Sequence, residues 1–222
     1  MPRRIKRLHQ WRANPYCQYT VQTVQCAAVK KASGNKRGRA ADSGATRVRI
    51  LDAAEARLLK YGPNGIVLDA VAAAARVSKG GLLYHFASKE ALVDGLIVRM
   101  LDAFDEVQAT AAAADRKVAG KWTRAYLFST VTDAGEPADN SAQLMAGILA
   151  AIDNDPVRLR VIRKRFATLH RRLEDDGIDP VDATIVRLAA DGLWLSALLG
   201  LPRIDKRVRA GVLAALKKMI RG

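Results

Sequence analysis

The chain has 222 residues, half of them hydrophobic but only 5% aromatic, so its core must rest on Ala, Leu, Val and Ile. Its net charge of +15 favours a polyanionic partner, either nucleic acid or an anionic membrane surface. Its apolar runs are shorter than the ~18 residues that a membrane span needs, and its two cysteines, Cys17 and Cys26, are too few for a disulfide framework.

The beginning of the chain is strongly basic. Residues 1–45 hold ten Lys and Arg residues and one acidic residue, Asp42. The segment 33–45 is rich in Gly, Ser and charged residues, which is typical of a flexible linker. We therefore expect residues 1–43 to form a basic, disordered N-terminal extension, which either contacts a polyanion or is simply a soluble tail.

Helical spacing of the apolar residues, together with the abundance of Ala, Leu and Arg, predicts an all-α protein with nine helices. The first helix is expected to start at a Thr46 or Ser43 cap and to end at Gly62-Pro63-Asn64-Gly65. The other eight are expected at 67–75, 78–84, 88–113, 119–132, 138–151, 157–174, 181–199 and 205–220.

Residues 77–92, VSKGGLLYHFASKEAL, contain two basic helix starts, Ser78-Lys79 and Ser88-Lys89. The short helices on either side of the Arg76-Val77 turn have the length and spacing of a helix-turn-helix, whose second helix enters the major groove of DNA. Two glycines follow Lys79 and would let the backbone approach DNA, although each costs the helix roughly 1 kcal/mol. The second helix start can bind phosphate through its free N–H groups and Lys89.

Individual roles follow from this arrangement. Lys79 can reach a phosphate or a guanine edge, and Ser78 can cap the helix and donate to phosphate. Tyr84 and His85 can bond the DNA backbone, whereas Leu82 and Phe86 are expected in the core. An ordinary helical protein would also place serine caps before short helices and could bury a Tyr-His-Phe step, so the spacing alone leaves both interpretations open.

The segments ILDAAEARLLKYG and LDAVAAAARVSKGGLLYHFASKEAL resemble the N-terminal domain of the tetracycline-repressor (TetR) family of bacterial transcriptional regulators. The resemblance implies a three-helix DNA-binding domain, here 44–94, and a six-helix ligand-binding and dimerisation domain, here 95–222. It also implies a homodimeric repressor in the bacterial cytoplasm, released from a palindromic double-stranded operator by a small-molecule effector. The DNA-binding residues would be Thr46, Arg47, Ser78, Lys79, Gly80, Gly81, Leu83, Tyr84, His85 and Lys89.

Three positions depart from the family pattern. Arg76 stands in the turn where a glycine is usual, and a left-handed non-glycine residue costs about 1 kcal/mol. Val67 cannot make the side-chain cap expected before the second helix, and Leu83 replaces a common aromatic residue. These departures bear on single contacts and leave the domain prediction unchanged.

Residues 96–222 carry no strong motif, and the resemblance guides their interpretation. In the family the last two helices form the dimer interface, for which the small or apolar residues Ala189, Ala190, Leu193, Ala197 and Leu198 are suited. Without the resemblance we would assign them to the chain's own core. The bulky candidates for an effector pocket are Trp122, Tyr126, Phe128, Met145, Phe166 and Trp194, each of which could equally be core.

An enzyme is not expected, nor are a cofactor, a metal or a membrane partner. The three histidines, His9, His85 and His170, have no ligand-spaced partners, and no phosphate-binding glycine loop occurs. Asp102, Asp105 and Glu106 have the spacing of a helical metal site, but a solvated helix face explains them better. The main alternative to a specific regulator is a non-specific or architectural nucleic-acid-binding protein driven by the basic extension.

Overall fold

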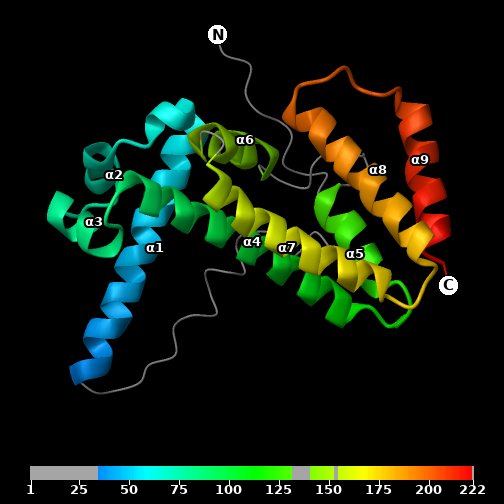
Figure 1. Ribbon diagram of the computed structural model, residues 1–222, viewed down its shortest axis with the longest axis horizontal. Coiled ribbons are helices and arrows are strands. Elements are labelled where there is room, and N and C mark those ends of the chain that lie inside the picture. Colours follow the sequence, from blue (N-terminus) through cyan, green and yellow to red (C-terminus); the bar gives the residue numbers. More distant parts are fainter. Residues whose placement is uncertain (1–34, 132–140, 153–154, 222) are drawn as a thin grey trace, which may run out of the picture. The chain divides into compact units, whose positions relative to one another are not determined.

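The computed structural model describes residues 35–131, 141–152 and 155–221, without the side chains of 35–42, 141 and 142. These residues form nine α-helices and one 3-10 turn, which confirms the predicted all-α fold (Figure 1). Most of the predicted basic extension lies outside the described residues. The elements are α1 (Asn35–Tyr61), η2 (Gly62–Gly65), α2 (Leu68–Ala74), α3 (Lys79–His85), α4 (Lys89–Ala114), α5 (Lys121–Thr130), α6 (Ser141–Ile152), α7 (Pro156–Glu174), α8 (Pro180–Leu198) and α9 (Lys206–Met219).

The start of α1 corrects one prediction. The segment 33–45 was expected to be a linker, but the helix already begins at Asn35. Ser43 and Thr46 therefore lie inside the helix and do not cap it. The segment holds no proline, and its Ala, Lys and Arg residues are good helix formers that outweigh its three glycines.

Helix starts elsewhere follow the sequence closely. The Ser78 hydroxyl accepts the N–H of Gly81 at 3.0 Å, and the Ser88 hydroxyl accepts that of Ala91 at 3.2 Å, as predicted. Each of the last three helices begins behind an aspartate whose carboxylate accepts backbone N–H groups of the first turn; these caps are Asp155, Asp179 and Asp205. Such caps satisfy N–H groups that a helix cannot pair internally.

One hydrophobic cluster joins the first four helices to α6. The predicted core residues Leu82 and Phe86 are 0% and 3% exposed, so that expectation is confirmed. Gly95 of α4 lets this packing close, because a Cβ there would lie 2.7 Å from the Phe86 ring. The buried members include Ile50, Leu51, Leu58, Val71, Leu92, Leu96, Leu101, Ile148 and Ile152.

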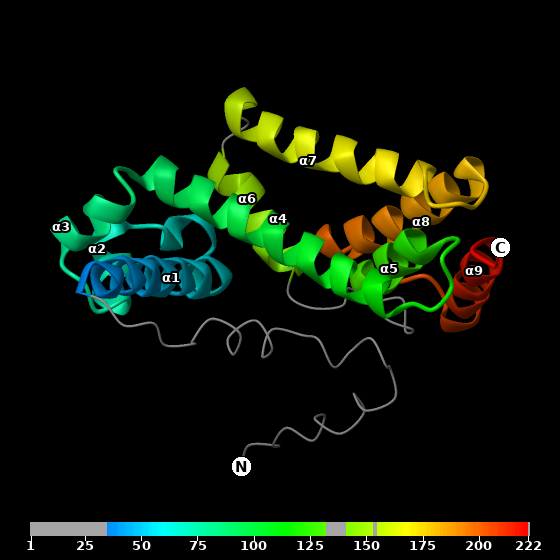
Figure 2. The same ribbon diagram turned by 90° about the horizontal axis from the view of Figure 1, so that it is seen from below.

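A second cluster is formed by α5, α7, α8 and α9, and its buried members include Tyr126, Leu127, Leu173, Val186, Leu213 and Ile220. The buried Asp176 fixes the start of α5 by accepting the N–H of Thr123 at 2.7 Å and its hydroxyl at 2.8 Å. Figures 1 and 2 show α7 running along α4 and α5 on one side of this bundle.

Arginines tie α4 to its neighbours on both sides. Arg99 bonds Asp52 at 2.6 Å and also pairs with Glu55, both on α1. Arg165 of α7 pairs with Asp102 and Asp105 of α4. Two of the three acidic residues with metal-like spacing are therefore engaged in ion pairs between helices. No helix within the described ranges is long and apolar enough to cross a membrane.

Candidate nucleic-acid interface

The turn between α2 and α3 sets the direction of α3. Arg76 has φ of 56°, so it adopts the left-handed conformation that glycine favours. The next N–H, of Val77, donates to the Ala72 carbonyl at 3.0 Å and closes the turn. Val67 is extended at the start of α2 and provides no side-chain cap, as its sequence predicted. The chain thus forms the helix-turn-helix despite both departures.

The two glycines of α3 have different surroundings. A Cβ on Gly81 would lie 3.2 Å from the Ser78 hydroxyl, so this glycine makes room for the cap. A Cβ on Gly80 would meet no atom nearer than 4.0 Å. Packing within the chain therefore explains Gly81 but not Gly80. An open backbone at Gly80 is what close approach to another molecule requires.

The far end of α3 presents an aromatic residue to solvent. Tyr84 is 81% exposed, although its neighbour Leu82 is completely buried. The ring of Tyr84 stands edge-on to the half-buried His85, with 5.2 Å between the ring centroids. Leu83 is exposed beside it at 37%. A large exposed aromatic side chain on a rigidly anchored helix is suited to contact with a partner.

Lys79 is already paired in the free chain. Its ammonium lies 3.1 Å from the carboxylate of Asp69 in the first turn of α2, and both side chains are more than half exposed. The sequence reasoning missed Asp69, although its place in the first turn of the helix-turn-helix was the available signal. An exposed pair of this kind is weak, so Lys79 can exchange Asp69 for phosphate at small cost.

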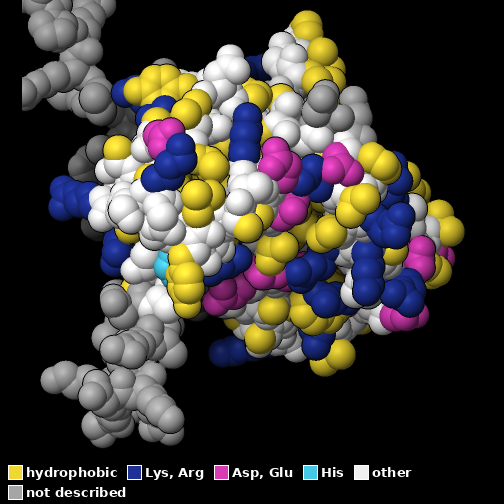
Figure 3. Space-filling view, turned by 60° about the vertical axis from the view of Figure 1, so that its left-hand side comes forward, with side chains coloured by type: hydrophobic (Ala, Val, Ile, Leu, Met, Phe, Trp, Pro, Cys, Tyr) yellow, Lys and Arg dark blue, Asp and Glu magenta, His cyan; other side chains and the backbone are white. Residues whose placement is uncertain are grey.

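The remaining predicted contacts surround α3. The Thr46 hydroxyl accepts a bond from Arg49 at 3.0 Å, and the guanidinium of Arg47 lies 4.8 Å from the centre of the Phe86 ring. Lys89 is exposed at the start of α4. Figure 3 brings the side with α2 and α3 forward and shows Lys and Arg spread among acidic side chains. Phosphate contacts on this face would therefore come from separate side chains.

The six predicted pocket residues have different surroundings in the part of the chain that the structure describes. Tyr126 is buried and bonds Asp191, while Phe166 packs against both hydrophobic clusters. Trp122 lies under the guanidinium of Arg172, and Phe128 lies under the ammonium of Lys217. Met145 and Trp194 are half-buried on α6 and α8.

Several buried polar groups lie in the predicted ligand-binding half of the chain, residues 95–222. Gln108 is completely buried, and neither its oxygen nor its nitrogen has a partner among the described residues. Burial raises the pKa of Tyr126, and the neighbouring Asp191 raises it further. Burial also lowers the pKa of His170, as does the nearby Arg187. An unsatisfied buried amide costs about 1–3 kcal/mol, so Gln108 is a point where a ligand would gain a bond.

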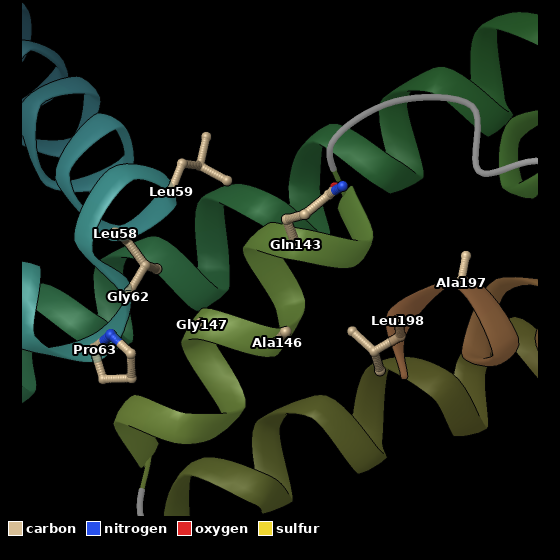
Figure 4. A pocket seen from close by; sticks show the side chains of 9 residues that line it. All are labelled: Leu58, Leu59, Gly62, Pro63, Gln143, Ala146, Gly147, Ala197 and Leu198. Carbon is tan, nitrogen blue, oxygen red and sulfur yellow. The ribbon is translucent and has the colours of Figure 1, made fainter. Parts of the chain in front are cut away.

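A cavity of about 330 Å³ lies between α1, η2, α6 and the end of α8 (Figure 4). Its wall is mostly apolar and includes the amide of Gln143 but no charged side chain. Ala197 and Leu198, predicted in the dimer interface, line it, whereas none of the six predicted pocket residues does. The cavity is therefore separate from the predicted effector pocket.

The other predicted interface residues face inward. Ala190 is completely buried, and Ala189 and Leu193 pack against the second cluster, so these residues belong to the chain's own core. The outward face of α8 is a different row, spaced alternately by four and three residues. It consists of Val181, Ile185, Leu188, Gly192, Leu195 and Leu199, whose five apolar side chains are 40–65% exposed. This spacing was readable in the sequence and is typical of a helix–helix seam.

Comparison with known proteins agrees with this architecture. Residues 50–96 match the model of bacterial regulatory proteins of the tetR family, and residues 120–221 match the tetracyclin repressor-like C-terminal domain. Among proteins with curated functions, none matches.

Solved structures give the same fold. A TetR family member from Streptomyces coelicolor A3 is 23% identical, covers 80% of this chain and 99% of its own, and has a TM-score of 0.55. A transcriptional regulator from Streptomyces coelicolor A3(2) is 20% identical with the same coverage and a TM-score of 0.60. The multidrug binding protein EbrR, complexed with ethidium, is 26% identical, covers 77% of this chain and 97% of its own, and has a TM-score of 0.55. The chain therefore belongs to the TetR family of bacterial regulatory proteins and carries the DNA-binding and ligand-binding domains of a transcriptional regulator.

Proposed function

We propose that this protein is a dimeric repressor that binds a palindromic operator through α3 and leaves it when a small molecule binds. The observation that carries the proposal is the surface of α3. The open backbone at Gly80, the displaceable ion pair of Lys79 and the exposed Tyr84 lie on a helix that Leu82 anchors. We keep the assignment of the ten DNA-contacting residues expected from the sequence. Asp69 forms an ion pair with one of them, Lys79, in the free chain.

The domain boundaries at 44–94 and 95–222 and the homodimer are parts of this proposal. The outward row of α8 supports a symmetric dimer, because a second copy would cover five exposed apolar side chains. Two-fold symmetry would place two α3 helices in successive major grooves, ~34–36 Å apart, and a palindrome would match them.

An effector that binds the sensor half would act by shifting the population towards dimers whose α3 helices no longer fit both half-sites. The similarity to EbrR, which is known in complex with ethidium, supports a small-molecule effector. The amide of Gln108, which has no partner among the described residues, supports a ligand with a hydrogen-bonding group. We place the protein with the DNA of a bacterial cytoplasm, and no catalytic step is part of this function.

Non-specific binding to nucleic acid is the second candidate, favoured by the net charge of +15. The two functions differ in salt dependence, because non-specific binding is almost wholly counterion release. The test is the affinity of Lys79→Ala and Tyr84→Ala for a genomic fragment that the parent protein retains at near-physiological salt. Both variants should bind that fragment more weakly while their mass in solution stays that of the parent. Unchanged affinity in both would exclude α3 as the reading helix.

A further inference from the structure

The first part of α1 extends beyond the hydrophobic core. We call residues 35–49 the arm; the helix that contains them begins at Asn35, and Ile50 is its first buried residue among the side chains described. From Ser43 to Arg49 every side chain is exposed or half-exposed, and a Cβ on Gly44 would have no atom within 4 Å. The described side chains of the arm, 43–49, thus have little packing to stabilise the helix.

The charge of the arm makes an isolated helix still less favourable. Its sequence holds Lys36, Arg37, Arg39, Arg47 and Arg49 against the single acid Asp42, and no acidic residue lies in the first turn. Basic residues at a helix N-terminus oppose the helix dipole, and short unpacked helices are marginal in water. A polyanion lying along the arm would favour the helix, because its negative charge would offset the positive charge of the basic residues.

The position of the arm identifies that polyanion. Figures 1 and 2 both show the N-terminal end of α1 on the side of the molecule that carries α3. The contact of Arg47 with the ring of Phe86, at the C-terminal end of α3, fixes where the arm leaves the core. A duplex held by α3 would therefore pass close to the arm.

We propose that the arm is a second DNA-contacting element, whose helix becomes fully formed along the phosphates beside the groove that α3 reads. This inference rests on the proposed function. Fifteen residues at ~1.5 Å each give an arm of about 22 Å, which spans roughly six base pairs at ~3.4 Å each. The arm adds affinity and extends the protected DNA, whereas α3 reads the sequence.

Two substitutions at Gly44 test whether the arm acts as a helix, because they leave every charge in place. Gly44→Ala favours the helix and has room for its methyl group. Gly44→Pro separates the arm from the core helix, which can still start at the proline. On a duplex selected by the parent protein, Gly44→Ala should bind as tightly or up to about fivefold tighter. Gly44→Pro should bind more weakly and protect a shorter stretch of DNA from cleavage. Equal affinity and equal protection in the two variants would overturn the helical arm.

A second pair of variants tests the phosphate contacts. The triple substitution Lys36→Gln, Arg37→Gln, Arg39→Gln is compared with Arg160→Gln, Arg163→Gln, Lys164→Gln, which removes the same charge from the exposed face of α7. Each lost phosphate contact reduces the slope of log affinity against log salt by about 0.9. The arm triple should lower the slope by about 2–3 and the α7 triple should leave it unchanged. Equal slopes for the two triples would overturn only the proposal that the arm contacts phosphates. A parent protein that binds DNA without sequence preference would overturn the proposed function itself.

Discussion

The ammonium of Lys79 lies 3.1 Å from the carboxylate of Asp69, so the lysine expected to contact DNA is held by an acidic residue of the neighbouring helix. The same carboxylate would lie close to the phosphates that Lys79 is proposed to contact and would repel them. We therefore expect the pair to weaken binding to any DNA while it keeps Lys79 in position.

Removing this carboxylate should strengthen DNA binding. We expect Asp69→Asn to bind duplex DNA a few-fold more tightly in a fluorescence titration, with the stability of the fold changed by less than about 1 kcal/mol. Glu106→Gln makes the same charge change at an exposed position of α4 and should have no effect. The gain should shrink when Lys79→Ala is added, because only the repulsion between Asp69 and the phosphates is then relieved; an undiminished gain would show that the Lys79–Asp69 pair has no part in it.

The two glycines of α3 should respond differently to alanine. Gly80→Ala should stabilise the fold by up to about 1 kcal/mol, because the position is open, yet weaken DNA binding. Gly81→Ala should give less or no stability, since its methyl group crowds the Ser78 cap. Thermal unfolding and DNA titration of both variants provide the comparison. Full affinity in Gly80→Ala would show that DNA does not approach this part of the backbone.

Strain in the turn gives a prediction about stability. Arg76→Gly should stabilise the protein by about 1 kcal/mol by relieving the left-handed conformation, and thereby raise the melting temperature by about 2–4 °C. Arg76→Ala loses the same guanidinium but keeps the strained backbone, so it should not melt higher. A similar rise in both variants would mean that charge, and not backbone strain, governs the turn.

The outward row of α8 predicts the dimer contact. Leu188→Arg should convert the proposed dimer to a monomer in light scattering, because two copies of the charge would meet near the two-fold axis. Val157→Arg adds the same charge at an exposed apolar position of α7 and should leave the dimer intact. A Leu188→Arg protein that remains dimeric would place the interface elsewhere.

Local signals in the sequence predicted most of the fold. Ser78 and Ser88 are caps because a hydroxyl before a helix can accept an N–H of its first turn, and Gly62–Gly65 ends α1 as expected. The predicted start of α1 was wrong because the helix continues through Gly38 and Gly44, which lie among helix-forming residues. In α8, Ala190 faces the core and Leu188 faces outward; composition alone does not separate them, because this helix is apolar on both sides. Three of the bulky residues proposed for the pocket, Trp122, Tyr126 and Phe166, lie in or against the second hydrophobic cluster, and their role as pocket residues stays a prediction.

The most direct test of the central claim is the selection of bound sequences from a random duplex pool by the purified protein at near-physiological salt, with Tyr84→Ala in parallel. Tyr84 is 81% exposed, so its removal should leave the fold intact. The account predicts that the parent recovers a palindrome with half-sites about one helical turn apart, and that Tyr84→Ala loses or relaxes this preference. Bound DNA without any enriched motif, or the same palindrome at undiminished affinity for Tyr84→Ala, would contradict it.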